Sequence, residues 1–127
     1  MAGRLPFVLT GDFNAGPDAA PIRFLTGRLT LEGQRGNLVD AWALVHPDEP
    51  GFTWEPRERI DYIFVSPSVR VHEAALAATE PNAQGGYPSD HCGLVAEVRM
   101  PTESDCATLK SSSGSTEKTA QARLLNA

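Results

Sequence analysis

Three short polar motifs, each joined to an apolar run, constrain the fold of this chain more strongly than any other feature. Gly11-Asp12-Phe13-Asn14 follows the apolar run 7–10, Asp61 lies within the run 60–65, and Ser89-Asp90-His91 leads into the run 94–98. Runs of β-branched and aromatic residues predict strands, so these polar side chains lie at or near strand ends. Packing gives no reason for that placement, whereas catalysis by a divalent metal and a histidine base does.

The hydrophobic pattern also predicts the other elements. Strands are expected at 7–10, 51–54, 60–65, 69–78 and 91–99, and helices at 21–26 and 38–45. The first run is short and apolar throughout, which is typical of a strand buried on both faces. Past Met100-Pro101 the chain is rich in Ser, Thr, Lys and Ala, and such a segment buries too little apolar surface to offset its ordering entropy. We therefore expect one domain over residues 1–101 and a disordered low-complexity tail over 102–127.

Composition narrows the class of protein. A chain of 127 residues holds one domain at most, because domains commonly contain about 100–150 residues. The net charge of −5 argues against avid nonspecific binding to nucleic acid, although a local basic patch would still permit a nuclease. No apolar run approaches the roughly 20 residues of a membrane-spanning helix and no signal peptide is evident, so the default expectation is a cytoplasmic location with no membrane span. Cys92 and Cys106 lack the spacing of a zinc site and are expected to be free thiols.

The first two motifs indicate specific chemistry. Asp12 and Asn14 are two positions apart and so share one face of an extended chain. Asp12 can ligate a hard cation or orient a water, and Asn14 can donate a hydrogen bond to a phosphate oxygen; the alternative is an Asx turn after a strand. Asp61 lies in an apolar strand and needs a partner there. That partner is either a histidine ring, whose tautomer Asp61 would fix, or Arg57 or Arg59 in a salt bridge.

The third motif places two polar residues side by side. The side chains of Asp90 and His91 point apart on an extended chain, which suits one of them on a metal ion and the other on the reacting group. An Asp-His pair without function is the alternative. The other histidines, His46 and His72, have no carboxylate or cysteine at ligand spacing and are expected on the surface. Trp54 is expected either to pack in the core or to stack on a substrate.

In this order the motifs resemble those of the endonuclease/exonuclease/phosphatase superfamily, the deoxyribonuclease-I-like phosphoesterases. The resemblance spans Leu5 to about Met100 and is carried by GDFN at 11–14, RIDYIFVS at 59–66 and SDH at 89–91. It implies an α/β (α+β) fold, part of a four-layer sandwich of mostly antiparallel sheets with flanking helices. It also implies hydrolysis of a phosphate ester that depends on Mg²⁺ or Mn²⁺.

The resemblance further implies a role for each motif residue. His91 is similar to the family's catalytic histidine, and Asp61 is similar to the aspartate that orients it. Asp12 and Asn14 match the residues that position the attacking water and hold the phosphate. The expected metal ligands are Asp12 and Asp90.

One half of such a domain has no counterpart among these motifs. The family's N-terminal half normally supplies a metal-binding glutamate and a further asparagine, and neither has a matching motif here. We therefore expect residues 1–101 to be the C-terminal half of a truncated domain. The expected partners are a phosphate ester of unassigned class as substrate and the missing N-terminal half. A catalytically inactive remnant, or an interaction module that keeps the strands, is the alternative.

Overall fold

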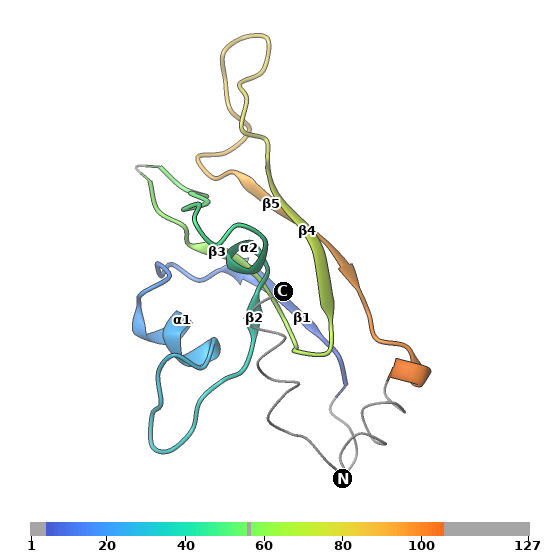
Figure 1. The fold of residues 1–127 in the computed structure, drawn as a ribbon. Helices are drawn as coiled ribbons and strands as arrows, with labels where there is room; N and C mark the ends of the chain where they lie inside the picture. Colours follow the sequence, from blue (N-terminus) through green and yellow to red (C-terminus); the bar gives the residue numbers. More distant parts are fainter. Residues whose placement is uncertain (1–4, 56, 106–127) are drawn as a thin grey trace.

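Antiparallel sheets form the framework of the protein (Figure 1). The structure, a computed structural model, describes residues 5–55 and 57–105. In chain order the described elements are β1 (Val8–Asp12), α1 (Ala20–Leu25), β2 (Val39–Asp40), α2 (Ala41–Val45), β3 (Asp61–Val65), β4 (Arg70–Ala77) and β5 (Gly93–Arg99). This combination of antiparallel sheets with a few short helices confirms the expected α/β class.

The first sheet has the strand order β1-β3-β2, with β3 in the centre. The register pairs Val8 with Val65 at one end and Asp12 with Asp61 at the other. β3 is the strand that the sequence predicts most clearly, since its residues are β-branched and aromatic. Its Phe64 and Val65 are completely buried, and Phe64 packs in the core cluster with Ile22 of α1.

A small aromatic core joins this sheet to α1. Ile22 of α1 packs on Tyr62 and Phe64 of β3, and all three are buried. The two aromatic rings of β3 stack with centroids 5.0 Å apart, and Phe13 meets both of them edge-on at 5.7 and 5.3 Å. Edge-to-face and offset-stacked rings add to the stability that burial provides. This core fixes the end of the sheet at which the first polar motif emerges.

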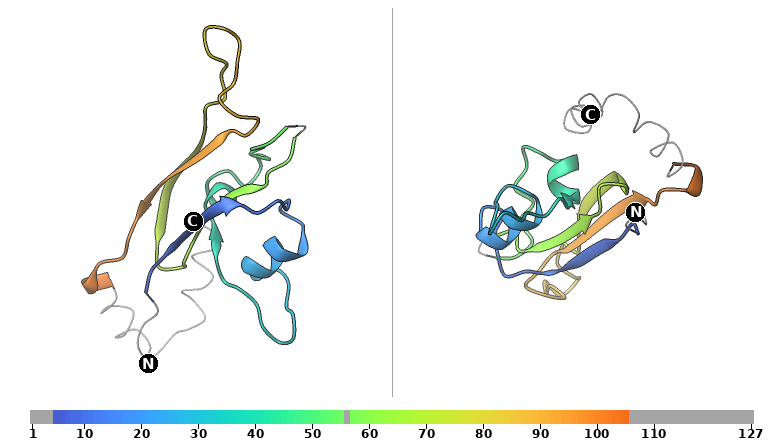
Figure 2. Two further views of the ribbon diagram at one scale, coloured as in Figure 1. Left: turned by 180° about the vertical axis from the view of Figure 1, so that it is seen from behind. Right: turned by 90° about the horizontal axis from the view of Figure 1, so that it is seen from below.

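The second sheet is the long hairpin of β4 and β5, which pair from Arg70 with Arg99 to Ala77 with Gly93. A β-bulge lies between Val71 and Glu73. Figures 1 and 2 show this hairpin on one side of the three-stranded sheet and α1 on the other, with the loop after β4 extending away from both. The chain returns from that loop at residue 91, beside the start of β3.

The burial predicted for the first strand is wrong. All five residues of β1 are exposed, among them Val8 at 42% and Leu9 at 37%. The physical reason is position, because β1 is an edge strand that pairs with β3 alone. An apolar run therefore marks a strand here without revealing what covers it.

Two other expectations differ from the structure. The predicted helix 38–45 is divided, because Val39 and Asp40 pair with β3 and only 41–45 is helical. The predicted strand 51–54 does not form. Instead the amides of Thr53 and Trp54 both donate to the carbonyl of Glu58 and close a tight turn. Of the predicted tail, 103–105 are helical and Asp105 accepts the amide of Thr102 at 2.9 Å, while 106–127 and Cys106 lie outside the described residues, so the disorder of the tail stays a prediction.

Candidate active site

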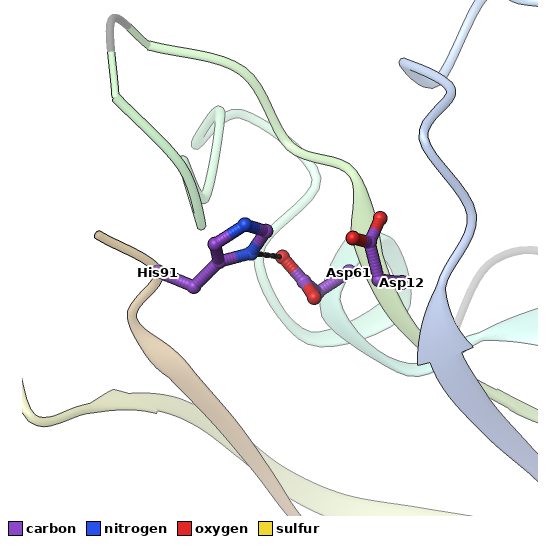
Figure 3. A group of neighbouring side chains, drawn as sticks. All are labelled: Asp12, Asp61 and His91. Atoms are coloured by element: carbon purple, nitrogen blue, oxygen red, sulfur yellow. Dashed lines mark hydrogen bonds and ion pairs between the residues drawn. The ribbon is translucent and has the colours of Figure 1, made fainter. Parts of the chain in front are cut away.

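A histidine and an aspartate from different sheets meet at one edge of the molecule. His91 Nδ1 and Asp61 Oδ2 are 2.8 Å apart, although the residues are 30 positions apart in the chain. Asp61 is the first residue of β3, and His91 lies two residues before β5 (Figure 3). Both side chains are half-buried, at 28% and 23% exposure. A carboxylate can only accept this hydrogen bond, so Nδ1 carries the proton and the second ring nitrogen, Nε2, is left free.

The hydrogen bond also changes the acid–base properties of the histidine. It is the main cause of a raised pKa at His91, because a carboxylate that accepts from the ring favours the charged form. Partial desolvation of the ring opposes this effect, and the negative charges of the nearby carboxylates add to it. A histidine whose tautomer is fixed and whose pKa is raised is suited to proton transfer near neutral pH.

Asp12 completes a cluster with this pair. Its carboxylate, one carboxylate oxygen of Asp61 and a ring nitrogen of His91 all lie within 4.8 Å of one another. The strand register brings this about, since Asp12 and Asp61 face each other at the ends of β1 and β3. Figure 3 shows the Asp12 carboxylate on the side of Asp61 opposite to the histidine. Two adjacent carboxylates of this kind can attract a divalent cation.

Asn14 follows β1 in a tight turn. Its backbone amide donates to Oδ1 of Asp12 at 2.8 Å, and its own φ is positive, at 47°. The Asx turn that the sequence offered as an alternative is therefore formed. The turn engages only one carboxylate oxygen of Asp12 and leaves the exposed Asn14 side chain without a described partner. A turn and a ligand-binding role are compatible at these two positions.

Asp90 lies apart from this cluster. Its Oδ2 accepts a hydrogen bond from the indole Nε1 of Trp54 at 3.2 Å, and the residue is exposed. That hydrogen bond is the main reason why the pKa of Asp90 is lowered. The side chains of Asp90 and His91 thus have different hydrogen-bond partners. The role of Asp90 as a metal ligand stays a prediction. The Trp54 and His91 ring centroids are 6.3 Å apart, so Trp54 lies beside the site and not in the core.

The arginines near Asp61 do not pair with it. Arg59 donates to Asp40 at 2.6 Å, and both side chains are almost fully buried, at 7% and 9% exposure. The guanidinium also lies over the Tyr62 ring, 4.8 Å from its centroid, while Arg57 is exposed. The salt-bridge alternative for Asp61 is therefore wrong. The sequence gives no signal for the buried Arg59–Asp40 pair, because the two residues are 19 positions apart and meet only when β2 pairs with β3.

The histidines outside the motifs differ from each other. His72 is exposed, as predicted. His46 is half-buried, its Nε2 lies 2.7 Å from the carbonyl oxygen of Ala74, and its ring stacks on Trp42 at 4.3 Å. The expectation of a surface position for His46 is wrong, because the ring closes the contact between α2 and β4. It is a packing residue and lies outside the Asp12–Asp61–His91 cluster.

Together, His91, the aspartate that accepts its Nδ1–H and the adjacent carboxylate of Asp12 form one polar cluster on an α/β scaffold. Residues 2–91 match the model of the Endonuclease/Exonuclease/phosphatase family, and the chain belongs to this family. It is similar to the crystal structure of an endonuclease/exonuclease/phosphatase from Bacteroides vulgatus, with 25% sequence identity and a TM-score of 0.58. That match covers 76% of this chain and 37% of the other, so the chain spans well under half of that protein's length. No curated protein matches the chain. None of the helices within 5–55 and 57–105 has the length and apolar character needed to cross a bilayer.

Proposed function

We propose that this chain carries the proton-transfer and metal-binding groups of a divalent-metal-dependent phosphoesterase. The observation that supports this most strongly is the 2.8 Å hydrogen bond between His91 and Asp61, with Asp12 beside it. Three residues from three separate motifs converge there, in a chain that belongs to a family of nucleases and phosphatases.

The proposed role of the pair follows from its hydrogen bond. Asp61 holds the Nδ1 proton and so presents the lone pair of Nε2 to a water molecule. Nε2 takes a proton from that water as its oxygen attacks phosphorus, the ester P–O bond breaks, and the leaving alcohol oxygen takes up a proton from solvent. Asp61 stabilises the imidazolium that results, which is the arrangement that raises the pKa of His91 in the free protein. Asn14 is the proposed donor to a phosphoryl oxygen.

The carboxylates at the site fit a small, hard cation. Oδ2 of Asp12 and one oxygen of Asp61 have no hydrogen-bond partner within the described residues, since Asn14 and His91 occupy the others. Mg²⁺ and Mn²⁺ favour oxygen ligands of this kind and keep several waters. Such an ion would neutralise charge on the phosphoryl oxygens. Two or three protein ligands make a weak site, so we expect Mg²⁺ affinity no tighter than millimolar.

The exposed apolar strand supports a further part of the proposal. Phe7, Val8 and Leu9 are 46%, 42% and 37% exposed, and a wholly exposed apolar strand is unusual for a protein that acts alone. The solved relative contains much additional chain beyond the matched part. We propose that a further polypeptide segment covers β1 in the active protein. The same exposed strand favours the second candidate function, an interaction module without catalysis.

Two measurements test the assignment. In a phosphodiester-cleavage assay with saturating Mg²⁺, His91→Ala should lower turnover by at least about 100-fold, whereas the exposed His72→Ala serves as the matched control and should leave it unchanged. Independently of activity, Mn²⁺ should broaden the amide NMR signals of Asp12 and Asp61, and Asp12→Asn should weaken that effect. Full turnover of His91→Ala would refute the catalytic role. Absence of both turnover and selective broadening would favour the interaction module.

A further inference from the structure

The Asp61–His91 pair joins two sheets that share no strand pairing within the described residues. A hydrogen bond of 2.8 Å between half-buried side chains needs both backbones held in place. β3 positions Asp61, while His91 follows a loop whose residues 78–90 are all exposed. Something other than that loop must therefore hold His91 against the start of β3.

Thr53 contacts the backbone on the Asp61 side. It is completely buried, and its Oγ1 accepts hydrogen bonds from the amides of Ile60 and Asp61, each at 3.1 Å. Its own amide donates to the carbonyl of Glu58 at 2.9 Å, which closes the turn that leads into β3. The hydroxyl thus fixes the backbone of the residue that carries the carboxylate.

The same dipeptide contacts the backbone on the His91 side. The carbonyl of Thr53 accepts the amide of Cys92 at 2.7 Å. Trp54 forms an isolated antiparallel bridge with His91, and its indole donates to Asp90. The backbone on either side of His91 is therefore attached to the two residues that also hold the start of β3.

We propose that Thr53 is the positioning residue of the Asp61–His91 pair, with Trp54 as its support on the histidine side. This inference rests on the proposed catalytic role of the pair and adds the element that assembles it. Thr53 reaches no reacting atom. It acts by accepting three backbone amides, those of Ile60 and Asp61 at Oγ1 and that of Cys92 at its carbonyl, which together set the distance between the two side chains.

A buried threonine also contributes to stability, so the test must separate the two effects. Thr53→Val keeps the shape of the side chain and removes the acceptor for two amides, whereas Thr53→Ser retains the acceptor. Ser66→Ala is the matched control, because Ser66 lies directly after β3, is 7% exposed, and accepts the amide of Phe7 through Oγ at 3.1 Å. It removes a comparable buried hydroxyl at the far end of the strand.

The readout is the tautomer of His91 in the full chain, measured from the imidazole ¹⁵N shifts by long-range ¹H–¹⁵N NMR at a pH where the ring is neutral. Wild type, Thr53→Ser and Ser66→Ala should show the Nδ1–H form, which the carboxylate of Asp61 selects. Thr53→Val should lose that form. His46 and His72 provide internal references in each spectrum. A folded Thr53→Val protein that keeps the Nδ1–H form, or a wild type that lacks it, would overturn the inference.

A second measurement applies even if Thr53→Val does not fold. In the wild-type chain, the amides of Ile60, Asp61 and Cys92 should be protected together from hydrogen exchange. Rapid exchange at Cys92 would overturn the inference, because its bond to Thr53 links the two sides. Neither readout depends on catalysis. A chain without phosphoesterase activity can still confirm the positioning role, and an active chain can still refute it.

Discussion

The buried ion pair between Arg59 and Asp40 leads to a quantitative prediction for stability. Their side chains are 7% and 9% exposed and 2.6 Å apart, and the buried Nε of Arg59 has no hydrogen-bond partner among residues 5–55 and 57–105. Asp40 also caps α2 by accepting the amide of Ala43 at 3.2 Å. Asp40→Ala would therefore leave a guanidinium buried with no counter-charge and remove a helix cap in the same step.

The expected loss is a large part of the total stability. Removing one partner of a buried ion pair costs about 3–5 kcal/mol, and losing an N-cap costs about 1 kcal/mol. The sum, about 4–6 kcal/mol, compares with the roughly 5–15 kcal/mol that holds a typical domain folded. With a typical urea slope of about 1–3 kcal/mol/M, Asp40→Ala should thus lower the urea midpoint of unfolding by about 2–5 M, as measured by far-ultraviolet circular dichroism.

Two further variants make the prediction specific. Arg59→Met combined with Asp40→Ala removes the stranded charge and should recover all but about 1 kcal/mol of the loss, the part due to the cap. Asp18→Ala breaks the exposed ion pair with Arg28 and should barely move the midpoint, because the Asp18 side chain is 95% exposed. Equal urea midpoints for Asp40→Ala and Asp18→Ala would refute the reasoning. Burial would then have no effect on how much an ion pair contributes to the free energy of unfolding.

Three other outcomes follow from the site and from the exposed strand. Asp61→Asn should lower the pKa of His91 toward its ordinary value in an NMR titration. Because the folded pKa of His91 is raised in wild type, the stability that the pair provides is complete below the ordinary histidine pKa. This contribution is lost as the pH rises through the pKa that His91 has in the folded protein. The difference in unfolding free energy between wild type and Asp61→Asn should therefore shrink at alkaline pH, and a difference that grows would contradict the assignment. Trp54→Phe should raise the pKa of Asp90, visible in a ¹³C carboxyl titration, since the indole hydrogen bond is the main cause of its lowering; an unchanged value would exclude that cause. Wild type should self-associate in sedimentation velocity, and Val8→Lys should reduce this by placing charge on an exposed edge strand; a wild type that stays monomeric at high concentration would show that β1 needs no cover.

The motifs and the strands could be predicted from the sequence because their signal is local. Apart from Asp61, the run that forms β3 contains only residues that favour strands, and a lone carboxylate in such a run needs a partner. The sequence predicts either a histidine or an arginine as the partner of Asp61, and the structure shows the histidine. Burial depends on which elements lie opposite, and no pattern within 7–10 shows that β1 is an edge strand.

The remaining features depend on contacts between distant segments. The pairing of Val39 and Asp40 with β3 overrides the helical spacing that 38–45 shows. Thr53 has no sequence signature of its own, since a hydroxyl before a polar turn is common, and its position matters only once Asp61 and Cys92 lie beside it. The sequence does show that Thr53 lies directly before Trp54 and eight residues before Asp61. Only the fold shows that this spacing places its hydroxyl on the amide of Asp61.

The placement of Asp61 and His91 on separate sheets also has a kinetic consequence. β4 and β5 pair as a hairpin of nearby residues, whereas β1 reaches β3 across more than forty intervening residues. Local pairings of the first kind form early, and distant ones wait for chain closure. The Asp61–His91 hydrogen bond can close only after the two sheets dock, which makes it one of the last contacts to form. A transient detachment of the β4–β5 hairpin would likewise break the Asp61–His91 hydrogen bond while the three-stranded sheet stays folded. The rate at which this hairpin opens therefore sets the lifetime of the assembled site.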